Sequence, residues 1–158
     1  MVSRQVVTRS PEETIRLGRE IASQLAPPLI VLLIGDLGAG KTTLAKGLIA
    51  GLGVASEDDV TSPTFTLIHE YGPAEGGGLR VYHVDLYRIE TPRDLETLGL
   101  EDLLAERAVV IVEWGEKLGP FFRRAFPEGR MLEIRLKAVN DTERGIAIQS
   151  TKQEDLSG

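Results

Sequence analysis

The spacing of hydrophobic residues predicts an amphipathic helix near the start of the chain. Leu17, Ile21 and Leu25 recur every four residues, and Pro27-Pro28 ends the pattern. Ser10-Pro11-Glu12-Glu13 has the form of a capping box with proline at the first helical position. We therefore expect a helix that starts at Pro11, directly after an N-terminal strand.

A short apolar run follows this helix. Leu29 to Ile34 is hydrophobic at every position and too brief for a helix, which is typical of a strand buried on both faces of a parallel sheet. From Lys41 to Leu52, the apolar residues fall on one helical face. A strand, a glycine-rich turn and a helix are thus expected in succession, with helices on both sides of the sheet.

The second half of the chain predicts further strands. Two alternating runs, Thr64 to Tyr71 and Leu79 to Tyr87, flank a glycine-rich stretch and predict an antiparallel hairpin. Ala108 to Val112 predicts another buried strand, and Met131 to Lys137 and Gly145 to Gln149 predict more alternating strands nearer a sheet edge. The expected sheet is mixed and mainly parallel.

Length and composition limit the class of protein. A chain of 158 residues corresponds to about one domain, which we place at residues 1–150, with a polar, disordered tail at 151–158. The absence of cysteine excludes disulfides, thiolate metal sites and a cysteine nucleophile. The longest apolar run has only six residues and no leader segment is evident, so we expect a cytoplasmic protein without membrane contact. A net charge of −6 argues against independent binding to nucleic acid.

One segment carries a specific chemical signal. Gly35-Asp36-Leu37-Gly38-Ala39-Gly40-Lys41-Thr42 fits the P-loop pattern between a predicted strand and a predicted helix. Glycines allow backbone N–H groups to turn toward an anion, and the helix N-terminus adds its positive dipole end. Lys41 would contact the β- and γ-phosphates, and the Thr42 hydroxyl would coordinate Mg²⁺. The residues expected to bind the nucleotide are Asp36, Leu37, Gly38, Ala39, Gly40, Lys41, Thr42 and Thr43.

A Mg²⁺ site also requires a carboxylate at the end of a neighbouring strand, and two candidates exist. Glu113 follows the apolar strand Val109 to Val112, and Asp85 follows Val81 to Val84. We prefer Glu113 as the metal ligand because we expect its strand to be the more buried. Asp85 then either orients water or senses the γ-phosphate, or it merely caps the turn that follows.

Other residues near these motifs have both structural and functional interpretations. His83 and His69 fit packed cross-strand partners better than catalytic bases. Thr61 to Phe65 suits either a loop that closes on the nucleotide or a plain strand-entry turn. We interpret Trp114 as a packing aromatic and Phe121, Phe122 and Phe126 as core or covering residues, while Arg123 and Arg124 could contact phosphate or a partner.

Four blocks of sequence together resemble the bacterial TsaE family, in that family's order, and the resemblance covers about Pro11 to Leu136. One departure is Gly115, where many members have proline after the tryptophan. The blocks are Gly35 to Thr42; Thr61-Ser62-Pro63-Thr64-Phe65-Thr66-Leu67 with Glu70-Tyr71; His83-Val84-Asp85-Leu86-Tyr87-Arg88; and Val112-Glu113-Trp114.

The resemblance implies a single-domain P-loop NTPase that binds ATP and Mg²⁺ and hydrolyses ATP weakly when alone. It also implies a role in placing N6-threonylcarbamoyl on adenosine 37 of tRNAs that read codons beginning with adenine. TsaD, the transferase, and TsaB would be its partners, and tRNA would be reached only through them. Lys41, Asp85 and Glu113 would be the catalytic residues, and Thr42 and Glu113 the metal ligands.

Two other functions stay open. Metabolite kinases also combine a P-loop with an arginine-rich lid, to which Arg123 and Arg124 could belong. A GTPase-like switch would need a guanine-reading motif, and Thr151-Lys152-Gln153-Glu154 only approaches one.

Overall fold

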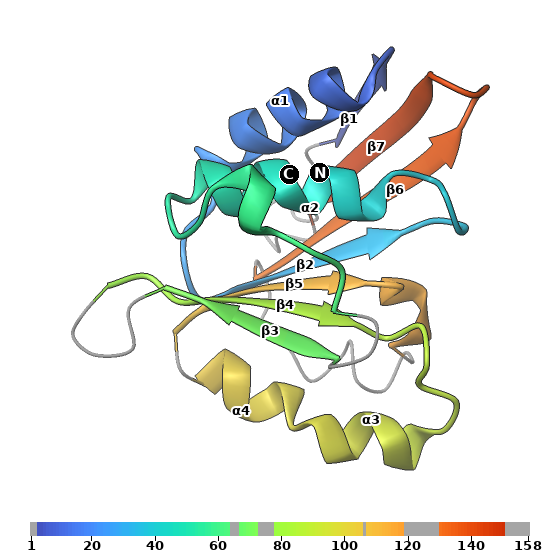
Figure 1. Ribbon diagram of the computed structural model, residues 1–158. Helices are drawn as coiled ribbons and strands as arrows, with labels where there is room; N and C mark the ends of the chain where they lie inside the picture. Colours follow the sequence, from blue (N-terminus) through green and yellow to red (C-terminus); the bar gives the residue numbers. More distant parts are fainter. Residues whose placement is uncertain (1–2, 64–66, 73–77, 106, 119–129, 151–158) are drawn as a thin grey trace, which may run out of the picture.

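A seven-stranded sheet crosses the molecule, in the strand order β1-β7-β6-β2-β5-β4-β3 (Figure 1). The computed structural model describes residues 3–63, 67–72, 78–105, 107–118 and 130–150. The strands are β1 (Ser3–Thr8), β2 (Leu29–Ile34), β3 (Ile68–Tyr71), β4 (Val81–Asp85), β5 (Val109–Glu113), β6 (Met131–Ala138) and β7 (Arg144–Ser150).

The sheet is parallel at its centre and antiparallel toward both edges. Strands β6, β2, β5 and β4 are parallel neighbours, while β3 pairs antiparallel with β4 and β7 pairs antiparallel with both β6 and β1. Five of the seven strands therefore point the same way. The expected mixed, mainly parallel sheet and its hairpin are confirmed. The outer edge next to β7 is formed by β1, so the alternating strand β6 lies further inside than we expected.

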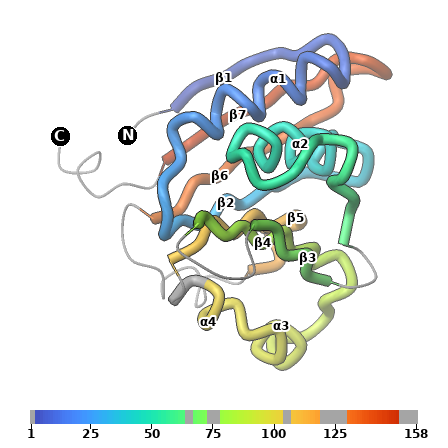
Figure 2. Tube along the Cα trace, turned by 60° about the vertical axis from the view of Figure 1, so that its left-hand side comes forward, coloured from blue at the N-terminus to red at the C-terminus, as the bar shows by residue number. Residues whose placement is uncertain are grey.

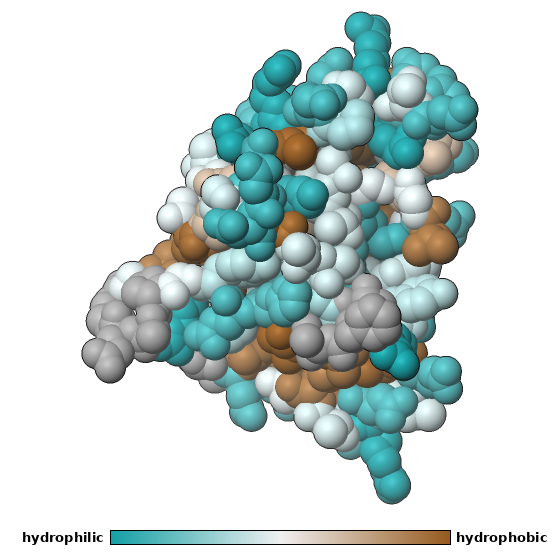
Figure 3. All heavy atoms as spheres, in the orientation of Figure 1, coloured by the Kyte–Doolittle hydropathy of each residue, from teal (hydrophilic) through white to brown (hydrophobic). Residues whose placement is uncertain are grey.

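Helices cover both faces of the sheet. Helices α1 (Pro11–Ala22) and α2 (Lys41–Gly51) lie together on one face, and α3 (Pro92–Leu98) and α4 (Leu100–Ala105) lie on the other (Figures 1 and 2). Two 3₁₀ turns, η1 (Glu57–Asp59) and η2 (Gly115–Lys117), complete the described elements. On the surface that Figure 3 shows, hydrophobic residues emerge mainly where α3 and α4 meet the sheet.

Strand β2 connects the two hydrophobic cores, as its sequence predicts. Val31 and Leu33 belong to the core beneath α1 and α2, whereas Ile30 and Leu32 belong to the core on the α3 and α4 side. All four side chains are fully buried. Successive side chains of a strand point to opposite faces, so an uninterrupted apolar run fits a strand between two layers of helices.

The first helix begins where its cap predicts. Ser10 Oγ accepts a hydrogen bond from the backbone N–H of Glu13 at 3.1 Å. The Glu13 carboxylate accepts from the N–H of Arg9 at 3.4 Å, so the expected reciprocal capping box is only half formed. The helix ends at Ala22, three residues before the last apolar position of the repeat.

Helices α1 and α2 pack with their backbones in contact. A Cβ atom on Gly47 would lie 2.1 Å from the carbonyl oxygen of Ile15, and one on Gly18 would lie 2.7 Å from that of Leu44. Only glycine allows such an approach without a shift of one helix. This contact fixes α2, and with it the loop that precedes α2, against α1.

The two helices between β4 and β5 were not expected, although the local signal for the first of them is present. Thr91 and Asp94 form a reciprocal capping box, Pro92 occupies the first helical turn, and Gly99 ends α3 in a left-handed conformation with φ of 69°. The expected tail at 151–158 and the aromatic residues Phe121, Phe122 and Phe126 lie outside the described residues.

Candidate functional site

Three chain segments meet at the carboxyl ends of the parallel strands. Strand β2 ends at Ile34 and continues through the glycine-rich loop into α2, while β4 ends with Asp85 and β5 with Glu113. Asp85 and Glu113 are register partners, and Leu33 pairs with Glu113 from the other side. Parallel strands thus bring the predicted loop and both predicted carboxylates to one edge, where ligands of α/β sheets bind.

The glycine-rich loop has the conformation that its sequence predicts. Gly38 and Gly40 have φ angles of 81° and 101°, a region that other residues rarely adopt. Gly40 is the N-cap of α2, and no side chain caps the N-terminus of this helix. The N–H groups of its first turn are therefore available to an anion.

Lys41 folds back over the loop from the first position of α2. Its Nζ donates hydrogen bonds to the carbonyl oxygens of Gly35 and Asp36, the latter at 2.9 Å, and lies 3.9 Å from the centroid of the Trp114 ring. Burial lowers the pKa of Lys41, and the carboxylates of Glu116, Glu113, Asp85 and Asp36 oppose this shift. The ammonium group thus lies against two carbonyl oxygens and an aromatic ring at the N-terminus of α2, and four carboxylates favour its charged form.

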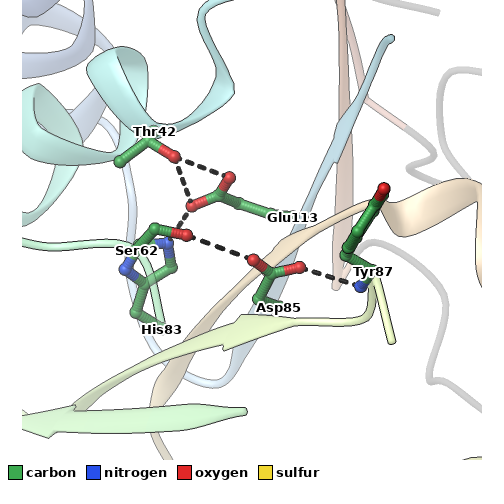
Figure 4. A network of polar contacts seen from close by, with 6 residues as sticks. All are labelled: Thr42, Ser62, His83, Asp85, Tyr87 and Glu113. Atoms are coloured by element: carbon green, nitrogen blue, oxygen red, sulfur yellow. Dashed lines mark hydrogen bonds and ion pairs between the residues drawn. The ribbon is translucent and has the colours of Figure 1, made fainter. Parts of the chain in front are cut away.

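Thr42 and Glu113 are joined directly. The Thr42 hydroxyl lies 2.8 Å from Oε1 and 3.0 Å from Oε2 of Glu113 (Figure 4). Glu113 is only 3% exposed. A hydroxyl that donates to a carboxylate keeps its oxygen lone pairs for a cation, and this pairing of hydroxyl and carboxylate suits Mg²⁺.

Asp85 holds two neighbouring segments through its two carboxylate oxygens. Oδ1 accepts a hydrogen bond from the N–H of Tyr87 at 2.8 Å, and Oδ2 accepts one from Ser62 Oγ at 3.1 Å (Figure 4). The first contact is the turn cap that we considered for this residue. The second connects the end of β4 to the segment that begins at Thr61, of which Thr64 and Phe65 lie outside the described residues.

His83 and His69 are cross-strand partners on β4 and β3, as expected. The ring of His69 packs edge-on against Tyr71 with centroids 6.4 Å apart. His83 is fully buried, and its Nε2 lies 2.6 Å from Oε2 of Glu113. This contact was not expected from the sequence, because it depends on β4 lying next to β5.

Trp114 does more than pack. It has a left-handed backbone conformation, with φ of 61°. The centroids of its ring and the Tyr87 ring are 5.1 Å apart, and Lys41 Nζ lies over the Trp114 ring. In η2, the carboxylate of Glu116 accepts a hydrogen bond from the N–H of Gly35 at 3.3 Å. The segment after β5 therefore contacts both the start of the loop and its lysine.

A cavity of about 620 Å³ opens over these groups. Of the residues expected to bind nucleotide, all but Asp36 and Ala39 line the cavity, and the Ala39 side chain is buried in the core. Sequence reasoning missed a further group of lining residues, which comes from the N-cap and start of α1, the turn between β6 and β7 and the first residue of β7. Its residues are Ser10, Pro11, Thr14, Asp141, Thr142 and Arg144.

Among the described residues, no group of three or more His, Cys, Asp or Glu side chains forms a metal cluster. In nucleotide sites, Mg²⁺ is held by one or two protein ligands together with phosphate oxygens and water. The pair of Thr42 and Glu113 has the donor set for such a shared site.

The fold and the site define an α/β protein in which the P-loop sequence pattern connects a central strand to a helix. The chain belongs to the TsaE family: the family model for "Threonylcarbamoyl adenosine biosynthesis protein TsaE" matches residues 8–146. Members of this family take part in tRNA threonylcarbamoyladenosine biosynthesis.

Curated relatives support this assignment. The TsaE protein of Bacillus subtilis is 40% identical over 139 residues, which is 88% of this chain and 80% of the relative. That of Treponema pallidum is 35% identical and covers 90% of this chain and 97% of its own length. That of Haemophilus influenzae is 41% identical over 65% of each chain.

A solved structure supports the fold. The crystal structure of Bacillus subtilis YdiB superimposes with a TM-score of 0.70 at 33% sequence identity and covers 99% of this chain and 95% of that one. In the part of the chain that the structure describes, no helix is long and apolar enough to cross a membrane.

Proposed function

We propose that this protein is the Mg²⁺-dependent ATP-binding and ATP-hydrolysing component of the system that forms N6-threonylcarbamoyladenosine at position 37 of tRNAs reading codons that begin with adenine. It acts in the cytoplasm on the transferase complex of TsaD and TsaB and does not itself transfer the group. Its contact with tRNA is indirect, through that complex. Membership of the TsaE family supports the pathway, and the site supports the nucleotide chemistry.

The observation that carries the proposal is the meeting of Lys41, Thr42 and Glu113 at one end of the cavity. Phosphates would enter the loop at the N-terminus of α2, where the N–H groups and the helix dipole favour an anion. Lys41 would exchange its two carbonyl acceptors in the loop for the β- and γ-phosphate oxygens. The lysine charge then balances the phosphates inside a site where burial strengthens electrostatic interactions.

Magnesium fits the polar pair formed by Thr42 at the start of α2 and Glu113 at the end of β5. Thr42 and Glu113 would hold the ion together with phosphate oxygens, and the bound ion would neutralise charge that develops on the γ-phosphate during hydrolysis. The Thr42 hydroxyl donates its hydrogen bond to Glu113, which would leave the lone pairs of the hydroxyl oxygen for the cation.

Asp85 lies next to Glu113 and would orient the attacking water. Its carboxylate is held at two points, by the N–H of Tyr87 and the hydroxyl of Ser62. The second contact joins Asp85 to Ser62, so a change at the γ-phosphate would alter the position of this serine. Through the contact between Asp85 and Ser62, hydrolysis of ATP would change the surface that a partner protein binds.

The rim of the cavity offers apolar surface to a partner. Leu37, at the tip of the loop, is 79% exposed, and Tyr87 is 47% exposed. Both residues line the cavity. A protein that covers the nucleotide would bury both side chains, which fits action on a partner complex better than action on a small acceptor molecule.

The P-loop site is compatible with the other two functions as well, so residues elsewhere in the chain must distinguish them. Arg123 and Arg124, which a kinase lid would use, lie outside the described residues, as does the near match to a guanine-reading motif at residues 151–154. A phosphorylated acceptor would identify a kinase, and a preference for GTP over ATP would identify a switch module.

Phosphate release separates these possibilities. We expect slow, Mg²⁺-dependent release from ATP by the protein alone, faster release with TsaB, TsaD and tRNA, and little release from GTP. Release that is unchanged by the partners would contradict action on the transferase complex. Absence of ATP binding would contradict the nucleotide site itself.

Partner binding provides a second test. Affinity for the TsaB–TsaD pair should differ among ATP analogue, ADP and no nucleotide, with a coupling of about 1–3 kcal/mol, and the linkage must be reciprocal. Multiple-turnover modification of tRNA should stop when this protein is omitted. Equal affinities in all three states, or unchanged modification, would reject the coupling.

A further inference from the structure

His83 is a fully buried, polar side chain in the middle of a parallel sheet. Its neighbour two positions earlier on β4, Val81, and its register partner on β5, Ile111, are both aliphatic and fully buried. An aliphatic residue would fill this position without burying a polar group. The presence of a histidine therefore calls for an explanation beyond packing.

The hydrogen bonds of His83 show what the histidine provides. Nε2 lies 2.6 Å from Oε2 of Glu113, whereas Nδ1 is buried with no hydrogen-bond partner among the described residues. A proton on Nδ1 alone would leave a buried N–H unsatisfied and direct an Nε2 lone pair at a carboxylate. The contacts therefore assign the proton to Nε2, which donates to Glu113.

Glu113 is consequently held from two directions. The His83 ring binds Oε2 from β4, and the Thr42 hydroxyl approaches both oxygens from α2 (Figure 4). Without His83, the carboxylate would keep only the Thr42 hydroxyl among these two partners and could turn about it toward the ammonium group of Lys41, whose pKa it raises. Second partners of this kind orient metal ligands and strengthen metal binding.

We propose that His83 is a positioning residue that holds the Glu113 carboxylate in the orientation required for Mg²⁺ binding beside Thr42. The inference rests on the proposed nucleotide site but assigns His83 a task within it. His83 is fully buried and does not line the cavity, so it would act on the metal only through Glu113. Its effect should therefore appear in the metal dependence of nucleotide binding and not in nucleotide affinity without metal.

The experiment compares two substitutions at this position. His83→Leu fills the buried position with an apolar side chain and removes the donor, while His83→Gln places an amide N–H near the position of Nε2. Mg²⁺ is titrated in the presence of a non-hydrolysable ATP analogue, and the fluorescence of Trp114, the one tryptophan of the chain, reports binding next to Lys41.

We expect His83→Leu to raise the apparent dissociation constant for Mg²⁺ by about 10- to 100-fold. Binding of the analogue in EDTA should change by less than about twofold, and His83→Gln should restore most of the Mg²⁺ affinity. His69→Leu on β3 is the matched control, because His69 pairs with His83 but packs against Tyr71. It should leave the Mg²⁺ titration unchanged.

Two outcomes would overturn the inference. One is a folded His83→Leu protein with the wild-type Mg²⁺ constant, and the other is a His83→Gln protein no better than His83→Leu. If His83→Leu fails to fold, His83→Asn replaces it, because the asparagine amide lies near the position of Nδ1 and cannot replace the Nε2 donor. Equal Mg²⁺ dissociation constants for His83→Asn and His83→Gln would then reject the positioning role of His83. Wild-type binding that ignores Mg²⁺ would reject the proposed function instead.

Discussion

One cavity opens at each end of the parallel strands, and the two cavities differ in the residues that line them. The first, of about 620 Å³, opens at the carboxyl ends of the parallel strands over Lys41, Asp85 and Glu113. The second, of about 380 Å³, opens at the amino ends of β2 and β6. Its lining includes the apolar residues Ile21, Leu25, Leu29 and Met131.

Buried charge distinguishes the two cavities. Lys41, Asp85 and Glu113 are each at most 5% exposed, and burial of such groups is costly unless they are paired or serve a ligand. At the second cavity, Arg4 lies at the surface and forms an ion pair with Glu20 at 3.0 Å. Volume alone would suggest a ligand site at both cavities, whereas buried charged side chains point to a ligand only at the first.

The largest effect should follow removal of the lysine in the first cavity. Lys41→Ala should abolish productive ATP binding, because each charged hydrogen bond to a phosphate contributes about 1.5–3 kcal/mol, more than tenfold in affinity. Titration calorimetry with ATP measures the loss. Lys46→Ala, on the same helix, is the control and should bind as the wild type does. Undiminished ATP affinity in Lys41→Ala would show that buried charge does not mark the first cavity as the nucleotide site.

A truncation at the second cavity should affect stability and not binding. Ile21 is buried in the core beneath α1, so Ile21→Ala should lower the free energy of unfolding by about 2–5 kcal/mol. Urea denaturation measures this, and Gln24→Ala, at an exposed position of the same cavity, should change it by less than about 0.5 kcal/mol. A fall in ATP affinity of folded Ile21→Ala would show that the two ends are coupled.

The two carboxylates of the first cavity should separate into metal binding and turnover. Glu113→Ala should preserve nucleotide affinity without metal and lose Mg²⁺-dependent hydrolysis by about 10- to 100-fold or more. Asp85→Ala should slow turnover with Mg²⁺ still bound. Single-turnover hydrolysis and Mg²⁺ titration distinguish the variants, and exchanged phenotypes would make Asp85 the metal ligand.

The contact between α1 and α2 spans the region between the cavities. Gly47→Ala would place a methyl group against the carbonyl of Ile15, and overpacking of this kind costs about 1–3 kcal/mol of stability. Gly145→Ala is the control, because its nearest contact would be an ordinary 3.7 Å. Denaturation should distinguish the two variants. A neutral Gly47→Ala would show that the helices can separate without penalty.

Local features of the sequence predicted much of this molecule. The strand Leu29–Ile34, the start of α1 and the start of α2 at Lys41 depend on the apolar pattern and on neighbouring residues. The helix α3 could have been predicted as well, because its capping box and terminal glycine are local. Neighbours in sequence determine these features, so a single sequence contains the signal.

What the sequence alone determined is a parallel α/β unit with a glycine-rich loop ahead of a helix, and carboxylates at the ends of two strands. The tertiary structure decided which of these groups meet. Placing β4 beside β5 brings His83 to Glu113, and placing α1 and the start of β7 beside α2 adds Thr14 and Arg144 to the cavity. Apart from the local hairpin of β3 and β4, strand order and helix packing arise from contacts between residues far apart in the chain, and the periodicity of one sequence does not encode which of the other strands are neighbours.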